Sequence, residues 1–172
     1  LSFVSLPIMT RLLTPADFGL LAMVATFTRL IEIFSDLGLA TATVQRKEIT
    51  QAQVSYLFWV NVAVGLFATA ITAALAPVAA WFYGEPDLTG ITLVLATAFV
   101  FGGLSVQHQA LMRRQMRFST LARLRVVASL GSVSVGIFAA LQGAGYWSLV
   151  AMSLASGLIM TIGLWWVCDW RP

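Results

Sequence analysis

Long runs without charge dominate this sequence and confine its charged residues to short clusters. Of 172 residues, 17 are charged: 10 are Lys or Arg and 7 are Asp or Glu. No charged residue occurs in 49–84, 88–112 or 126–168. A membrane-spanning helix needs about 20 mostly apolar residues, so the first two runs each predict one span and the third predicts two, separated at residues 142–145. A soluble domain could not cover its surface with so few charges.

This pattern predicts an all-α protein, a transmembrane bundle of about six helices. We expect the helical segments at about 1–13 (partial), 15–45, 51–83, 87–113, 119–141 and 146–168. Residues 14–17 and 50–53 both have the capping-box pattern that marks a helix start. The chain begins within a predicted helix and stops directly after a span, so we expect it to be a piece of a longer membrane protein.

Basic residues gather at alternate connections between these segments. Eight of the ten are Arg46, Lys47, Arg113, Arg114, Arg117, Arg123, Arg125 and Arg171. The intervening connections hold Asp17, Glu85, Asp87 and an uncharged turn. Because cytoplasmic loops carry the excess of Lys and Arg, we predict that the connections at 46–47 and 113–117 are cytoplasmic.

Aromatic and small residues predict two kinds of helix surface. Aromatic rings cluster at the predicted span ends, where amphipathic rings prefer the headgroup level. They are Trp81, Phe82, Tyr83, Tyr146 and Trp147 at the outer ends, and Tyr56, Trp59, Trp165, Trp166 and Trp170 at the inner ends. Small residues spaced by four, Ala128, Ser132, Gly136 and Ala140, favour close helix packing over a cavity wall.

One group of charges lies inside an apolar segment. At 100° per residue, Arg29, Glu32 and Asp36 fall in one narrow arc. Each charge near mid-bilayer costs about 2.5–3.5 kcal/mol, so this charged stripe must face the bundle interior or a water-filled cavity. Two interpretations stay open. Arg29 and Glu32 neutralise each other, or the stripe lines a translocation cavity in which Arg29 receives an anionic group and Glu32 or Asp36 an ion or proton.

Further polar residues have alternative interpretations. The cluster Arg113, Arg114, Arg117, Arg123 and Arg125 either sets topology and binds anionic headgroups, or captures a diphosphate on the cytoplasmic side. His108 is interpreted as a helix contact in preference to a ligand or proton relay, and Cys168 as a small apolar residue. Metal-spaced His/Cys clusters and phosphate-binding loops are missing from the sequence. We therefore expect no enzyme, metal site or cofactor, and leave open a coupling H+ or Na+.

Several stretches occur in an order typical of one transporter group. They are LLTPADFG at 12–19, FSDLGL at 34–39, LFWVN at 57–61, residues 76–83, ALMRRQMRF at 110–118 and GYWSLV at 145–150. Together they cover essentially the whole chain. The set resembles the polysaccharide-exporter branch of the multidrug/oligosaccharidyl-lipid/polysaccharide flippase superfamily.

This resemblance implies a bacterial inner-membrane flippase for undecaprenyl-diphosphate-linked oligosaccharides, serving lipopolysaccharide or exopolysaccharide assembly. It implies two six-helix lobes around a central cavity, with residues 1–172 as most of the N-terminal lobe. Arg29 fits the family's cationic cavity, although Glu32 and Asp36 make the net charge of these three residues negative. The lipid bilayer and polysaccharide assembly proteins are the expected partners, and nucleic acid is not. The alternatives are a cation-coupled multidrug antiporter of the same superfamily and a membrane-embedded transferase or assembly subunit.

Overall fold

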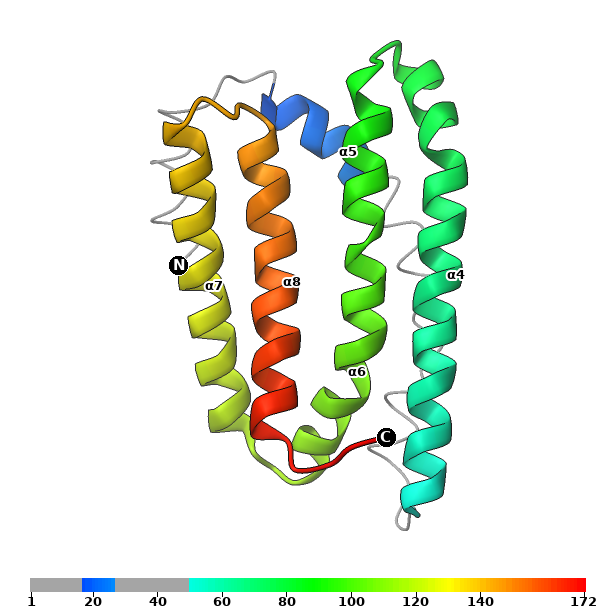
Figure 1. The fold of residues 1–172 in the computed structure, drawn as a ribbon, viewed down its shortest axis with the longest axis vertical. Helices are drawn as coiled ribbons and strands as arrows, with labels where there is room; N and C mark the ends of the chain where they lie inside the picture. Colours follow the sequence, from blue (N-terminus) through cyan, green and yellow to red (C-terminus); the bar gives the residue numbers. More distant parts are fainter. Residues whose placement is uncertain (1–16, 27–49) are drawn as a thin grey trace.

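Long helices joined by short turns make up the described part of the chain (Figure 1). The computed structural model describes residues 17–26 and 50–172. A short helix, Asp17–Thr26, is followed by α4 (Gln51–Tyr83), α5 (Asp87–Ala96), α6 (Ala98–Arg114), α7 (Phe118–Leu141) and α8 (Trp147–Val167). Only Thr97 separates α5 from α6, and its backbone angles stay helical (φ −62°, ψ −20°). Asp87–Arg114 is therefore one continuous span.

The predicted spans agree closely with these helices. The segment predicted at 51–83 coincides with α4, and the bounds of the later three differ from the prediction by one residue at most. In the described ranges, four helices are long and apolar enough to cross a membrane. The prediction of an all-α transmembrane bundle is confirmed. The predicted segment at 1–13, and the second segment beyond Thr26, lie outside the described residues.

The start of α4 confirms one predicted capping box. The backbone N–H of Gln53 donates to Thr50 Oγ1 at 3.3 Å, and the backbone N–H of Thr50 donates to Gln53 Oε1 at 3.2 Å. These bonds satisfy two donors that a helix start would otherwise leave without partners. At its other end α4 stops at Gly84, whose left-handed backbone (φ 71°) suits glycine.

The long helices lie side by side in the order α7, α8, α5–α6 and α4 (Figure 1). The predicted small-residue face of α7 is its buried face, which packs in the α7–α8 pair; Ala128, Ser132, Gly136 and Ala140 are all buried. For that face, the prediction of close helix packing rather than a cavity wall is therefore confirmed. On α4 and α6, the close approach occurs at Gly65 and Gly103. A Cβ atom at Gly65 would lie 2.6 Å from the Phe99 carbonyl oxygen.

Polar side chains also link neighbouring helices. Thr69 on α4 donates its hydroxyl to the Ala96 carbonyl at 3.0 Å, and Thr161 on α8 donates to the Phe101 carbonyl at 3.3 Å. The indole N–H of Trp165 donates to the Leu104 carbonyl at 3.2 Å. Helices in lipid gain little from apolar burial against each other, so such bonds and small-residue contacts stabilise the arrangement.

Large apolar side chains cover the outside of the helices. Phe67 on α4, Phe138 on α7 and Trp166 on α8 are each more than 60% exposed. Contiguous apolar surface of this kind favours aggregation in water but is the ordinary outer face of a helix in lipid. The apolar exposed surface and the lengths of the spans therefore both indicate a multi-pass membrane protein.

The turn between α6 and α7 holds a methionine where glycine is usual. Met116 has a left-handed backbone (φ 56°) and its side chain is 75% exposed. The N–H of Arg117 donates to the Met112 carbonyl, and that of Met116 to the Arg113 carbonyl, both at 3.0 Å. This is a Schellman ending. The end of α7 repeats the pattern with Gly143 (φ 79°) in the equivalent place.

We expect Met116→Gly to raise the free energy of unfolding by about 0.5–1 kcal/mol. Glycine removes a left-handed penalty of about 1–2 kcal/mol, and its greater freedom in the unfolded chain offsets part of that gain. The matched variant Gly143→Ala should lower stability by a similar amount. Thermal unfolding of the detergent-solubilised protein measures both, and a loss of stability in Met116→Gly would contradict the prediction.

Candidate functional site

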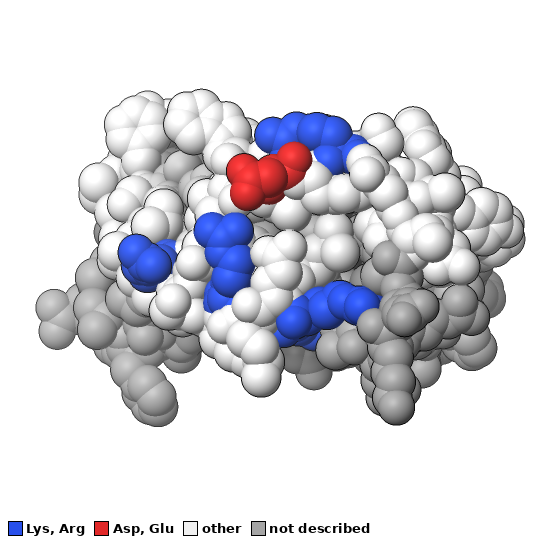
Figure 2. All heavy atoms as spheres, turned by 90° about the horizontal axis from the view of Figure 1, so that it is seen from below, with Lys and Arg blue, Asp and Glu red and all other residues white. Residues whose placement is uncertain are grey.

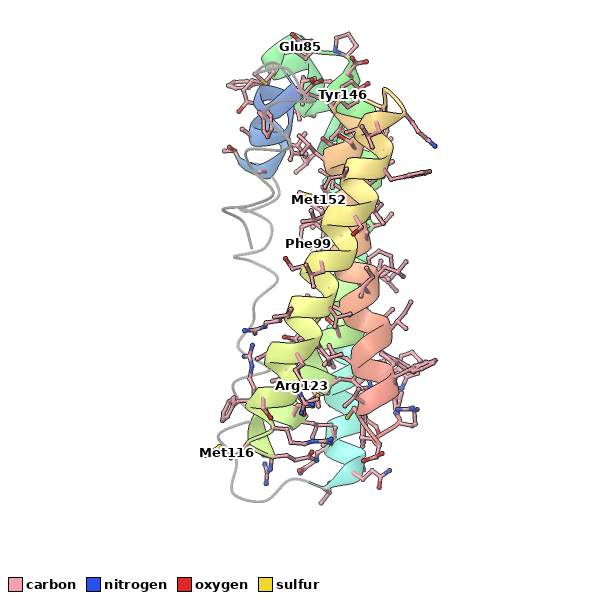
Figure 3. The ribbon with its side chains drawn as sticks, turned by 90° about the vertical axis from the view of Figure 1, so that its left-hand side faces the viewer. Glu85, Phe99, Met116, Arg123, Tyr146 and Met152 are labelled. Atoms are coloured by element: carbon pink, nitrogen blue, oxygen red, sulfur yellow. The ribbon has the colours of Figure 1, made fainter. Side chains whose placement is uncertain are left out.

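Charge separates the two ends of the bundle. Arg113, Arg114, Arg117, Arg123, Arg125 and Arg171 lie at the end where α6 meets α7 and α8 stops. We call this the basic end. Figure 3 places Met116 and Arg123 there and Glu85 and Tyr146 at the opposite end. Seen end-on in Figure 2, basic side chains are spread across the basic end beside one acidic patch. The described part of the chain thus shows the charge asymmetry predicted from the sequence.

Helix ends position the arginines of the basic end. Arg113 and Arg114 occupy the last turn of α6, where cations interact favourably with the negative end of the helix dipole. Arg117 directly precedes α7, and Arg123 and Arg125 lie on its first turns. The Nε of Arg123 donates to the Ser119 carbonyl at 3.4 Å.

Exposure makes these arginines available to a ligand. Arg113, Arg123 and Arg125 are exposed, whereas Arg114 and Arg117 are half-buried. A guanidinium group offers several N–H donors in a plane that matches phosphate oxygens. The arrangement can therefore receive phosphate groups at the membrane surface, from a lipid headgroup or from a diphosphate. Both interpretations of the arginine cluster remain predictions.

An aromatic cluster lies just inside the basic end. His108 on α6 is fully buried and stacks on Trp165 of α8, with ring centroids 4.9 Å apart and planes at 30°. Trp170 meets the His108 ring edge-on at 5.2 Å, and Phe58 of α4 does so at 5.9 Å. We call Phe58, His108, Trp165 and Trp170 the aromatic box. The interpretation of His108 as a helix contact is confirmed.

The aromatic box adds helix contacts to two of the tryptophans predicted at the inner span ends. Trp165 and Trp170 are half-buried and contact the Phe58 ring. Trp59 and Trp166 are exposed. Spacing along one helix does not show which face meets a neighbouring helix, so the sequence did not predict the aromatic box. The available signal was that His108 and the tryptophans lie near the same end of neighbouring spans.

The charged stripe lies outside the described residues, as do Arg46 and Lys47. The described part of its segment is Asp17–Thr26, which packs mainly through Val24 against Leu88 and Ile91 of α5 and Val150 of α8. At 100° per residue, Val24 lies on a different face of this segment from the charged stripe. Ala22, in the arc of the stripe, is exposed. The roles of Arg29, Glu32 and Asp36 stay predictions.

Comparison with known proteins identifies similar chains. A family model described as "Polysaccharide biosynthesis protein" matches residues 8–172. The "Succinoglycan biosynthesis transport protein ExoT" of Rhizobium meliloti (strain 1021) is 30% identical over 174 residues, covering 100% of this chain and 35% of the relative. The "Lipopolysaccharide biosynthesis protein WzxC" of Escherichia coli (strain K12) is 26% identical over 159 residues, covering 92% of this chain and 32% of the relative.

A third relative has a related name. The "Teichuronic acid biosynthesis protein TuaB" of Bacillus subtilis (strain 168) is 29% identical over 110 residues, covering 62% of this chain and 23% of the relative. The chain spans about a third of the length of the first two relatives. No solved structure matches it.

Proposed function

Because the chain belongs to the polysaccharide biosynthesis protein family, we propose that it is part of an exporter of lipid-linked oligosaccharides. The complete protein would move undecaprenyl-diphosphate-linked sugar units across the bacterial inner membrane for lipopolysaccharide or exopolysaccharide assembly. Residues 1–172 would form most of the N-terminal lobe of a two-lobed transporter. The name of one relative, the "Succinoglycan biosynthesis transport protein ExoT", refers to transport, which supports a transporter rather than an enzyme.

The gathering of the six arginines of the basic end, among the described residues, carries this proposal. A lipid-linked sugar has a diphosphate between a polyprenyl chain and a water-soluble glycan. Exposed guanidinium groups at the membrane surface suit the diphosphate, and the apolar outer faces of the helices suit the prenyl chain. The positive-inside rule places the basic end in the cytoplasm, where the substrate would first be captured.

The charged stripe supplies the second step of the proposal. Charges at that depth have to face protein or water, and a cavity between two lobes offers both. Arg29 would receive the diphosphate after its capture, and Glu32 or Asp36 would bind the coupling H+ or Na+. Rocking of the lobes about this site would then expose the substrate to the other side.

Complementation of an export-deficient strain tests the proposed function. We expect the full-length protein to restore surface polysaccharide and to remove the lipid-linked sugar that accumulates at the inner face of such cells. We expect no change in resistance to cationic drugs. A double variant, Arg113→Glu combined with Arg117→Glu, tests capture at the basic end. It should reduce export because it reverses the charge at the capture site.

Each other outcome supports a different class of protein. Drug resistance without polysaccharide would show a multidrug antiporter. Polysaccharide restored in a strain that lacks a glycosyltransferase but has intact export, and not in the export-deficient strain, would show a transferase. Normal export by the double glutamate variant would contradict capture at the basic end.

A further inference from the structure

Residues 168–172 fold back across the basic end after α8, which Figure 1 shows as the segment running under α6 toward α4. We call them the strap. Cys168 leaves the helix in an extended conformation (φ −89°, ψ 122°). Its side chain is 3% exposed and packs with Val54 of α4 and Leu111 of α6, and Trp170 contacts the same cluster. The strap therefore joins α8 to two other spans.

Arginine 171 fixes the shape of the strap. Its Nη1 donates to the Cys168 carbonyl at 2.6 Å and to the Trp170 carbonyl at 2.9 Å. Its guanidinium carbon lies 5.8 Å from the centre of the Trp165 ring, within reach of a cation–π interaction. These contacts hold Trp170 in the aromatic box against His108.

The docked strap also buries polar atoms at a cost. His108 Nδ1, His108 Nε2 and Trp170 Nε1 are buried without a hydrogen-bond partner among the described residues. The Leu104 carbonyl lies near the His108 ring and accepts a hydrogen bond from Trp165. Its oxygen could accept a second bond, but neither His108 nitrogen meets hydrogen-bond geometry with it. A buried donor or acceptor without a partner destabilises the state that buries it, and water would satisfy all three nitrogens if Trp170 withdrew.

Two opposing effects thus act on the same contact. Burial of the Trp170 ring against His108 and Phe58 favours the docked strap. The three unsatisfied nitrogens favour its release. Packed contacts change between discrete arrangements rather than deforming continuously, so these effects bear on whether the strap is docked or released.

We propose that the strap is a releasable latch at the basic end, docked by the insertion of Trp170 beside His108 and opened by its withdrawal. When docked it holds α8 against α4 and α6, and when open it frees that end of α8. The latch depends on the packing of these residues alone and does not require any particular transported substrate.

Cys168 provides a built-in reporter, because the docked strap buries its thiol. The experiment measures the labelling rate of Cys168 by N-ethylmaleimide in the full-length protein in native membranes, with cysteines outside this chain replaced by serine. Trp170→Ala removes the docked ring and should raise the rate about tenfold or more. His108→Phe keeps an aromatic ring but removes two unsatisfied nitrogens, so it should lower the rate about tenfold.

Two further variants make the test decisive. Trp166→Ala alters a side chain that is 86% exposed, and it should change the rate by no more than about twofold. Trp170→Phe keeps the ring and loses Nε1, so it should label more slowly than the wild type. If Trp170→Ala fails to insert, His108→Phe and Trp170→Phe still decide the question. Labelling of both as fast as the wild type, or faster, would overturn the latch, since the buried nitrogens of His108 and Trp170 would then not favour release of the strap.

Discussion

Gly103→Ala is expected to lower the free energy of unfolding by about 1–3 kcal/mol, although alanine is the better helix former. A Cβ atom at this position would lie 2.7 Å from the Asn61 carbonyl oxygen and 3.2 Å from the Val62 Cα atom. Both are backbone atoms of α4, which cannot rotate away as a side chain can. The added methyl group must therefore push α4 away from α6.

The neighbouring glycine is a matched control. Gly102 has no atom within 4 Å of its added Cβ, so Gly102→Ala should stabilise α6 by about 0.5–1 kcal/mol through its helix propensity alone. Thermal unfolding in detergent and the yield of folded protein measure both variants. Opposite signs at adjacent residues identify the α4–α6 contact as the cause. Equal effects at the two positions would show that the two helices do not approach closely at Gly103.

Arg29→Ala and Glu32→Gln are each expected to reduce polysaccharide export about a hundredfold or more while membrane insertion stays normal. Removal of a charged group that binds the substrate or the coupling ion loses hydrogen bonds worth about 1.5–3 kcal/mol each, and each 1.4 kcal/mol corresponds to a factor of ten in binding. Export is measured as surface polymer from the complemented strain, and insertion as the amount of full-length protein in the membrane.

The double variant separates the two interpretations of the charged stripe. If Arg29 and Glu32 only neutralise each other, Arg29→Ala combined with Glu32→Gln removes both charges of that pair together and export should return. If they line a substrate cavity, the double variant stays inactive. Arg29→Lys, which keeps the charge, is the conservative control. Full polymer production by both single variants would refute the cavity site.

The spans could be predicted closely because each depends on its own residues. The charge-free run at 49–84 predicted α4, and the Thr50–Gln53 bonds confirmed where it begins. The buried face of α7 was also predictable, since small residues at spacing four are a local pattern. Met116 was not, because no residue-type rule places a methionine in a left-handed turn.

Contacts between distant segments could not be predicted in the same way. Trp165 and Trp166 are adjacent in the sequence, and both were expected at the headgroup level. Trp165 packs on His108 instead, whereas Trp166 is exposed. The two indole rings have similar affinity for the membrane–water interface. Only the position of α6 beside α8 decides which of them becomes buried.

The sequence by itself determined that this protein crosses a membrane, where the four described spans begin and end, and which end of them is basic. These properties follow from the transfer of each segment into lipid, which depends on that segment's composition. The tertiary structure decided the close approach of Gly65 and Gly103, the aromatic box and the docking of the strap. In lipid all apolar faces of a helix are nearly equivalent, so shape and hydrogen bonding with a particular neighbour select the face that packs.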